Sequence, residues 1–432
     1  SNVVKTIKSD SFKSSILREH NKSRAKRKKS SISIPKSFKI IPKHIGRWLV
    51  DQKKSPDRDS GNLEDVLYSA KASDLILIRP GDYLISGLNI KKSLTIKGLG
   101  KDKKDVVIFP IKKSSLNIQS DDFAPLEISN LTISAKKIDQ YGDPFIKVLK
   151  GKLTLENVDI LSSGQEIGLL FEKKSIGIIR SSFLSSGERG IGIQLNNSSH
   201  LKLSNTTFKN NRIGIYGEIQ NFKGKIEIHN CKLLKSRSAG VAIYGGYLTA
   251  YRSLFKNNLV GISLRKNARG KLSRVEIINN ELNGIDVDSY SSLEIDSSLI
   301  EGNQKFGIQA NEHVISFLIQ DSSITGNKTA LFINQNSKVK IINSLISENH
   351  LHGILIDNNS NLTLTGSTIA TNKERGISLS KSKAIITHSN IKNNRFGIHA
   401  NDKSNIKLKN NHFEKNTQDI KNVFNNSKIE DI

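Results

Sequence analysis

The stretch NHLHGILIDNNSNLTLTGSTIATNKERGISLS, residues 349–380, decides the fold because it contains one short phrase twice. Asn349 precedes Gly353-Ile354, and Asn372 precedes Gly376-Ile377 after a period of about 23 residues. Between the two copies, residues 361–364 alternate polar and apolar side chains with the period of a β-strand. The phrase therefore indicates a repeat built from short strands.

The same phrase recurs from about residue 160 onward, at intervals of roughly 21 to 26 residues. Its glycine positions are Gly168, Gly190, Gly214, Gly240, Gly261, Gly284, Gly307, Gly353, Gly376 and Gly397, with Ala330 in the one vacancy. Most of them follow an Asn by four residues: Asn210, Asn257, Asn280, Asn303, Asn349, Asn372 and Asn393. We expect these Asn side chains to stack as an amide ladder, and Gly284, Gly307, Gly353 and Gly376 to turn corners with positive φ.

A period of about 23 residues with short strands and no helical pattern predicts an all-β fold, a single-stranded right-handed parallel β-helix. Successive coils would stack their aliphatic side chains inside, at a strand spacing of about 4.8 Å. One cysteine, Cys231, excludes an internal disulfide and a four-cysteine zinc site, so the stacked core must hold the fold.

The predicted domain organisation has three parts. Residues 1–50 form a basic arm, residues 51–416 the β-helix, and residues 417–432 a C-terminal cap or tail. An amphipathic helix near 62–71 would cap the first coil, because Leu63, Val66 and Leu67 share one face and exposed terminal coils invite aggregation.

The opening coils carry a family resemblance. After the predicted helix come Arg79-Pro80-Gly81-Asp82-Tyr83 and the strand SLTIKGLG at residues 93–100. This order resembles pectin-lyase-like right-handed β-helix proteins, and the Gly-Ile repeats resemble β-helix repeats of the carbohydrate-binding and sugar-hydrolase (CASH) type, over roughly residues 60–416. The resemblance implies a right-handed β-helix fold and a carbohydrate ligand. The family it points to includes lyases, hydrolases, epimerases and non-catalytic binding proteins. It also favours an extracellular or cell-envelope location.

The chain carries 67 Lys+Arg against 40 Asp+Glu, a formal net charge of +27. Residues 1–50 hold a large share of this excess. Such a block of like charges is typical of a flexible, solvated tail, and the alternative is an arm that contacts an anionic surface. Nucleic-acid binding ranks last, because the arm lacks interleaved aromatic residues and any recognised reader module. No apolar run is long enough for a transmembrane segment.

Local catalytic signatures of pectate lyases, polygalacturonases and mannuronan epimerases are missing from the chain. Candidate catalytic residues must come from the second and fourth positions after each glycine, because the alternation of side chains along a strand directs these two positions outward. Asp286 and Asp288 stand there on one strand, with Arg265 one coil earlier and a separation of about 7 Å between the two carboxylates. That separation suits an inverting glycosidase. Alternatively, the pair with Asp357 would hold Ca²⁺, with Arg265 as the base of a lyase.

Other outward residues are candidates for substrate binding: Tyr244, Tyr247, Tyr251 and Arg252 as an aromatic patch, and Asn311, Asn334 and Asp357 as a polar ladder. The simpler interpretation is that these side chains only keep an exposed sheet soluble. His350 and His352 stand two residues apart without an evident third ligand, so no metal site is assigned.

Two functions follow. The first is a non-catalytic scaffold that binds an acidic polysaccharide or a protein partner along its coils, without a cofactor. The alternative is a lyase, epimerase or hydrolase acting on an acidic glycan, with Ca²⁺ only in the lyase. Regular coils without long loops favour the scaffold. Residues 136–145 could form one side of a groove, which keeps the enzyme as an alternative.

Overall fold

The computed structural model describes residues 46–53, 55–86, 89–110, 116–119, 125–135, 144–218, 222–422 and 427–431. These residues all belong to one compact unit, 39–432. The arm predicted at residues 1–50 therefore lies outside the described residues up to position 45, as do residues 136–143 of the proposed groove wall.

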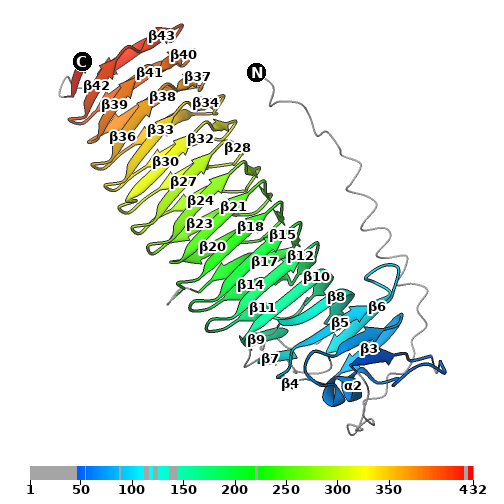
Figure 1. Ribbon diagram of the computed structural model, residues 1–432. Coiled ribbons are helices and arrows are strands. Elements are labelled where there is room, and N and C mark those ends of the chain that lie inside the picture. Colours follow the sequence, from blue (N-terminus) through cyan, green and yellow to red (C-terminus); the bar gives the residue numbers. More distant parts are fainter. Residues whose placement is uncertain are drawn as a thin grey trace. The chain divides into compact units, whose positions relative to one another are not determined.

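Each repeat forms one coil of three strands, and every pairing between coils is parallel. One coil contains β36 (Asn361–Thr365), β37 (Thr368–Ala370) and β38 (Arg375–Ser380). The next coil contains β39 (Lys383–Thr387), β40 (Asn390–Lys392) and β41 (Phe396–Asn401), each paired with its counterpart. Figure 1 shows the strands of successive coils side by side. The predicted parallel β-helix is confirmed.

The third strand of each coil belongs to one sheet of fifteen strands among the described residues, which we call the glycine sheet. Its members are β4 (Asn89–Ile90), β7 (Leu116–Gln119), β9 (Ile146–Lys150), β11 (Ile167–Phe171), β14 (Gly187–Leu195), β17 (Asn211–Gly217), β20 (Ala239–Tyr244), β23 (Val260–Arg265), β26 (Ile285–Val287), β29 (Phe306–Ala310), β32 (Thr329–Ile333), β35 (His352–Ile356), β38, β41 and β44 (Gln418–Asn422).

The first two strands of each coil form a thirty-stranded sheet within the described part of the chain. Besides β36, β37, β39 and β40, its members are β1 (Arg47–Val50), β2 (Leu75–Ile78), β3 (Gly81–Ile85), β5 (Leu94–Gly98), β6 (Val106–Pro110), β8 (Pro125–Ser134), β10 (Lys152–Leu161), β12 (Ile176–Arg180), β13 (Phe183–Ser185), β15 (His200–Ser204), β16 (Thr207–Lys209), β18 (Lys225–His229), β19 (Lys232–Leu234), β21 (Tyr247–Tyr251), β22 (Leu254–Lys256), β24 (Arg269–Ser273), β25 (Glu276–Ile278), β27 (Ser292–Asp296), β28 (Leu299–Glu301), β30 (Ser316–Gln320), β31 (Ser323–Thr325), β33 (Lys338–Ile342), β34 (Leu345–Ser347), β42 (Asn405–Lys409), β43 (His412–Glu414) and β45 (Lys428–Asp431).

The core consists of aliphatic side chains that alternate inward and stack from coil to coil. Leu362 and Leu364 of β36 are buried and lie beside Ala384 and Ile386 of β39. Each fully buried Leu or Ile contributes roughly 1.5–3 kcal/mol relative to an exposed one. A continuous column of such residues explains how a chain with 36% hydrophobic residues forms a solenoid.

The predicted amide ladder is present, with its register corrected. The side-chain amides of Asn258, Asn280, Asn303, Asn327, Asn349, Asn372 and Asn394 each donate to the Asn one coil further on, the last to Asn416. Asn210, Asn257 and Asn393 are not members, because they stand one residue earlier and take positive φ values of 55, 55 and 56°. The Asn residues expected four positions before each glycine therefore belong to two different sites. Some turn a corner of the coil with positive φ, and the others belong to the ladder.

The expected positive φ at the repeat glycines is wrong, because other residues turn the corners. A Cβ atom at Gly353 would lie 2.5 Å from the carbonyl oxygen of Gly376 and 3.0 Å from the amide nitrogen of Asn372. Glycine is needed there because the strand passes close to the next coil and to the ladder.

The helix α2 (Leu63–Ser69) begins after Asn62, whose side chain accepts a hydrogen bond from the Glu64 N–H. Its residues Leu63, Val66 and Leu67 are buried in the core. Figure 1 shows α2 at the blue end of the chain. The predicted capping helix is therefore present, two residues shorter at its C-terminal end than expected.

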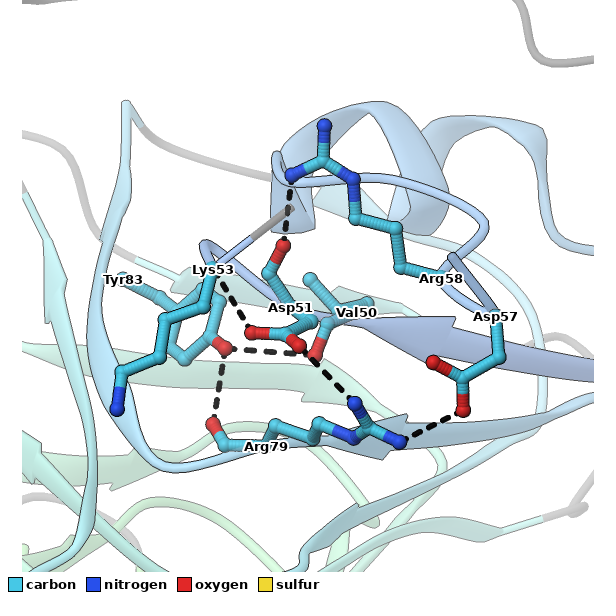
Figure 2. Close-up of polar contacts among 7 residues, drawn as sticks. All are labelled: Val50, Asp51, Lys53, Asp57, Arg58, Arg79 and Tyr83. Atoms are coloured by element: carbon cyan, nitrogen blue, oxygen red, sulfur yellow. Dashed lines mark hydrogen bonds and ion pairs between the residues drawn. The ribbon is translucent and has the colours of Figure 1, made fainter. Parts of the chain in front are cut away.

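Figure 2 shows how the Arg79 to Tyr83 turn fastens the first coils together. Arg79 bridges the carboxylates of Asp51 and Asp57 at 3.2 and 2.7 Å. The Tyr83 hydroxyl lies 2.8 Å from the carbonyl oxygen of Arg79, and burial raises the pKa of Tyr83 to about 12. Since these groups have their partners within the protein, we interpret them as a structural clasp.

Both domain boundaries predicted from the sequence differ from the structure. β1 pairs with β2, so the β-helix already includes residues 47–50 of the proposed arm. β44 and β45 pair with β41 and β42, so coils continue past residue 416. The apolar pattern was too short at both ends to reveal these strands. Within the described residues, no helix has the length and apolar character needed to cross a membrane.

Candidate active site

The outer face of the glycine sheet carries three columns of side chains: the residue before each glycine, and the second and fourth residues after it. The first and third residues after each glycine point into the core, as Ile285 and Val287 do around Asp286. The repeat positions expected from the sequence are wrong for one pair of strands. β11 and β14 align Gly168 with Gly192, whereas the glycine spacing had aligned Gly168 with Gly190. Gln194 consequently shares a column with Leu170 and Tyr216.

Asp286 lies partly buried at the centre of this face. The side-chain amide of Asn283 donates to Asp286 Oδ1 at 2.6 Å and to Gln309 Oε1 at 2.9 Å. Burial raises the pKa of Asp286, against the lowering effects of Asn283 and Arg265. The carboxyl group is therefore biased toward holding a proton.

Asp288 forms an ion pair with Arg265 of the preceding coil, at 3.3 Å between Oδ2 and Nε. Arg265 Nε also lies 3.2 Å from the Ser263 hydroxyl, which fixes the guanidinium group. Burial raises the pKa of Asp288 although Arg265 lowers it. Asp288 Oδ1 and Asn311 Oδ1 are both buried and have no hydrogen-bond partner among the described residues. The site thus offers two acceptor oxygens to a ligand.

The structure brings together the predicted catalytic residues Asp286, Asp288 and Arg265. Two residues of strand rise place the two carboxyl groups about 7 Å apart on one face. Asn311 follows in the next coil, and Tyr244 lies beside Arg265.

The calcium-binding alternative loses its third ligand. Asp357 follows β35, three coils beyond Asp288, which corresponds to about 14 Å at the strand spacing. Arg265 already holds Asp288. Among the described residues, no three His, Cys, Asp or Glu side chains gather as a metal-binding group.

The predicted aromatic patch is divided between the two sheets. Tyr244 lies on the glycine sheet, at 6.1 Å from Tyr216 between ring centroids. Tyr247 and Tyr251 are the first and last residues of β21 in the other sheet, and Arg252 lies over the Tyr251 ring at 5.0 Å. The Gly245-Gly246 turn between Tyr244 and Tyr247 changes sheets, which short sequence spacing could not reveal.

The column before each glycine was missed from the sequence, because simple alternation would direct it inward. It contains Phe306, whose ring stacks on Phe332 at 5.2 Å, and also Asn283, His352, Arg375 and Phe396. Asn334 and Asp357 continue the outermost column, where Asn334 Oδ1 accepts a hydrogen bond from Asn358. The repeated polar or aromatic residue directly before glycine was the available signal.

A model described as the right handed beta helix region matches residues 105–248, 191–333 and 329–432. These segments together span residues 105–432. The chain belongs to this right-handed β-helix family. The resemblance to pectin-lyase-like β-helix proteins is therefore confirmed for the fold, including its handedness.

Several solved structures resemble this β-helix protein. The periplasmic alginate epimerase AlgG is 13% identical, over 86% of this chain and 83% of that chain, with a TM-score of 0.41. The catalytic unit of a GH87 alpha-1,3-glucanase from Streptomyces thermodiastaticus is 11% identical, over 90% and 69%, with a TM-score of 0.48. The A-module of the Azotobacter vinelandii mannuronan C-5 epimerase AlgE4 is 15% identical, over 85% and 93%, with a TM-score of 0.34. No curated protein sequence matches the chain.

Proposed function

We propose that this β-helix protein is a polysaccharide-active enzyme whose catalytic groups are Asp286 and Asp288. The observation that carries the proposal is the environment of Asp286, a partly buried carboxyl group with a raised pKa on the same strand face as a second carboxylate. Perturbed titratable groups of this kind concentrate at functional sites.

The spacing of the two carboxyl groups favours hydrolysis with inversion. Asp286 would donate its proton to the glycosidic oxygen as the bond to the anomeric carbon breaks. Asp288 would accept a proton from the attacking water on the opposite face of the sugar, in the gap of about 7 Å. Arg265 would hold Asp288 in position and favour its ionised form against the effect of burial. No cofactor is required for these steps.

An extended glycan fits the dimensions of the sheet. The coil spacing of about 4.8 Å is close to the rise of one sugar residue along a polymer. Tyr244 and the Phe306–Phe332 pair flank the acidic centre and offer faces for sugar stacking, while Asn311, Asn334 and Asp357 offer polar contacts. Arg265 and Lys305 near the centre favour an acidic polymer.

A non-catalytic scaffold is the second candidate, and the regularity of the coils favours it. The described connections between strands are short, without a long loop that would wall a cleft. The same face would then bind an acidic polysaccharide or a protein partner without changing it.

The test compares Asp286→Asn and Asp288→Asn with Asp321→Asn. Asp321 is exposed outside the glycine sheet and has a positive φ that Asn tolerates, so it is the matched control. Each protein is incubated with alginate, polygalacturonate, a glycosaminoglycan and a neutral glucan, and reducing ends and polymer length are measured.

We expect the unsubstituted protein and Asp321→Asn to shorten one acidic polymer, with loss of at least about a thousandfold in rate in both site variants. Equal cleavage by Asp286→Asn would refute the assignment. Retention of a polymer on the protein without any cleavage would instead support the scaffold.

A further inference from the structure

A second cluster of polar side chains lies on the glycine sheet, several coils beyond Asp286. His352 opens β35 and pairs in register with Arg375, the first residue of β38. In the next coil, His399 of β41 lies beside Ser378 of β38. Three consecutive strands therefore bring two imidazoles, a guanidinium group and a hydroxyl group to one place, about 19 Å from Asp286 at four coil spacings.

The cluster has hydrogen-bond capacity that the described residues leave unused. Within the part of the chain that the structure describes, the Nδ1 atoms of His352 and His399 are both buried and have no hydrogen-bond partner. His399 is only 4% exposed, so water does not readily satisfy its ring. Arg375 Nη1 donates to the Ser378 hydroxyl at 3.3 Å, which fixes the direction of the guanidinium group. Buried polar atoms without partners cost free energy, and a ligand would recover it.

The charge of the cluster is positive and uncompensated. Among the described residues no carboxylate forms an ion pair with Arg375, because the adjacent Glu374 is held by Arg395 at 3.0 Å. Lys421 of β44 lies beside His399 and adds a second cation. Two cations that no carboxylate neutralises within the described residues favour an anion, and their charge disfavours a metal ion.

The protonation state of the two histidines is consistent with a preference of the cluster for an anion. Burial, followed by the charge of Arg375, lowers the pKa of both His352 and His399 to about 4. At neutral pH each ring is uncharged and can donate through one N–H. Glu374, Arg375 and Lys421 are the charged groups that act on these two rings.

We propose that His352, Arg375, Ser378 and His399 form an oxyanion-binding site that takes the carboxylate, sulfate or phosphate group of its ligand. The guanidinium group would bind two oxygens of the anion side by side. The imidazole N–H groups would complete its shell. The site lies too far from Asp286 to take part in bond cleavage, and it does not depend on catalysis at Asp286.

Two sources of the anion are possible, a free small molecule or an acidic sugar of a bound polymer. In the second case, Phe332 and Leu355 occupy the same column between the two sites and would carry the intervening sugar rings.

The experiment titrates the full chain with inorganic sulfate, inorganic phosphate, galacturonic acid and its trimer, with galactose as the neutral control. Binding is followed by calorimetry and by the imidazole signals in NMR spectra. Arg375→Gln removes the guanidinium group, while Arg212→Gln, at an exposed position on β17 of the same sheet, is the matched control.

We expect at least one oxyanion to bind and to shift the His352 and His399 signals, with affinity about tenfold or more weaker in Arg375→Gln. Arg212→Gln should remain within about twofold, and galactose should not bind. Because anion binding favours the charged imidazoles, whose pKa is about 4 in the unbound protein, sulfate affinity should rise as the pH falls from 5 toward 4. Tighter binding of the trimer than of the monomer would assign the anion to a polymer.

The proposal is overturned if no oxyanion shifts the two imidazole signals of the folded wild-type protein. Equal weakening by Arg212→Gln, or a response of these rings to Zn²⁺ alone, would overturn it as well. Asp286→Asn should leave anion binding unchanged, so loss of the anion site and loss of the proposed enzymatic function remain distinguishable.

Discussion

The two sheets of the coil share one backbone pattern and differ in what their outer faces carry. On the thirty-stranded sheet, Lys338, Lys340, Lys383 and Lys407 are exposed to solvent. On the glycine sheet, Asn283, Ser378 and His399 are buried although they point outward, and Asp286 is partly buried. Alternation alone therefore does not make an outer face a solvated one.

The difference comes from the extra column of side chains before each glycine. Because the chain bends into the strand at this point, residues such as Phe306, His352 and Arg375 lie against the next column. Their contact shields the polar groups between them from water. Shielding raises the pKa of carboxyl groups and lowers that of imidazoles, which a fully exposed lysine face does not do.

The largest expected effect concerns the glycine that permits this arrangement. We expect Gly353→Val to lower the free energy of unfolding by about 3 kcal/mol or more, because the new side chain meets the carbonyl oxygen of Gly376 and the Asn372 amide. Gly270→Val in the thirty-stranded sheet meets only the Cδ1 ends of Leu264 and Leu293, and should cost less. Urea unfolding of both variants measures the difference, and equal costs would contradict the assigned close approach.

The amide ladder should contribute somewhat less per residue. Asn303→Ala removes the acceptor for the Asn280 backbone N–H and side-chain amide, which should cost about 2 kcal/mol. Asn361→Ala, at the start of β36 in the other sheet, should change stability by no more than about 0.5 kcal/mol. If chemical denaturation gave the two variants the same stability, the ladder would not hold the coils together.

The buried histidines should make the protein less stable in acid. The folded-state pKa of His399 is about 4, below the ordinary value near 6.5, so the unfolded chain binds the extra proton first. The stability that the buried neutral imidazole contributes at neutral pH is then lost as the pH falls from about 6.5 toward 4. We expect His399→Asn to flatten this part of the stability profile, whereas His412→Asn, at an exposed position on β43, should leave its slope unchanged.

The smallest expected effect concerns Asp286. Its folded-state pKa is raised, so stability falls as the pH rises through the region between the ordinary and the raised value. Above that region Asp286→Asn should therefore melt slightly higher than the unsubstituted protein, and this gain should vanish near pH 3.8. Calorimetric scans near pH 3.8 and above that region measure the difference in melting temperature. Asp321→Asn is the variant expected to show no gain.

The sequence predicted the fold through its periodicity, because each coil must present the same inward aliphatic residues to its neighbours. It also placed Asp286, Asp288 and Arg265 together, since a known period converts sequence distance into coil distance. The role of Gly353, the division of Tyr244 from Tyr251, and the burial of His399 were not predictable, because they depend on where the chain bends between strands. Period alone contains no information on those bends.

We expect the glycine sheet, and not the lysine-bearing outer face of the other sheet, to take an extended glycan over Asp286. The most direct measurement is a crystal structure of Asp286→Asn soaked with an oligosaccharide of the polymer that the protein cleaves or retains. We expect sugar rings along β23 to β32, with a glycosidic oxygen next to residue 286. Sugar bound only across the thirty-stranded sheet would contradict it.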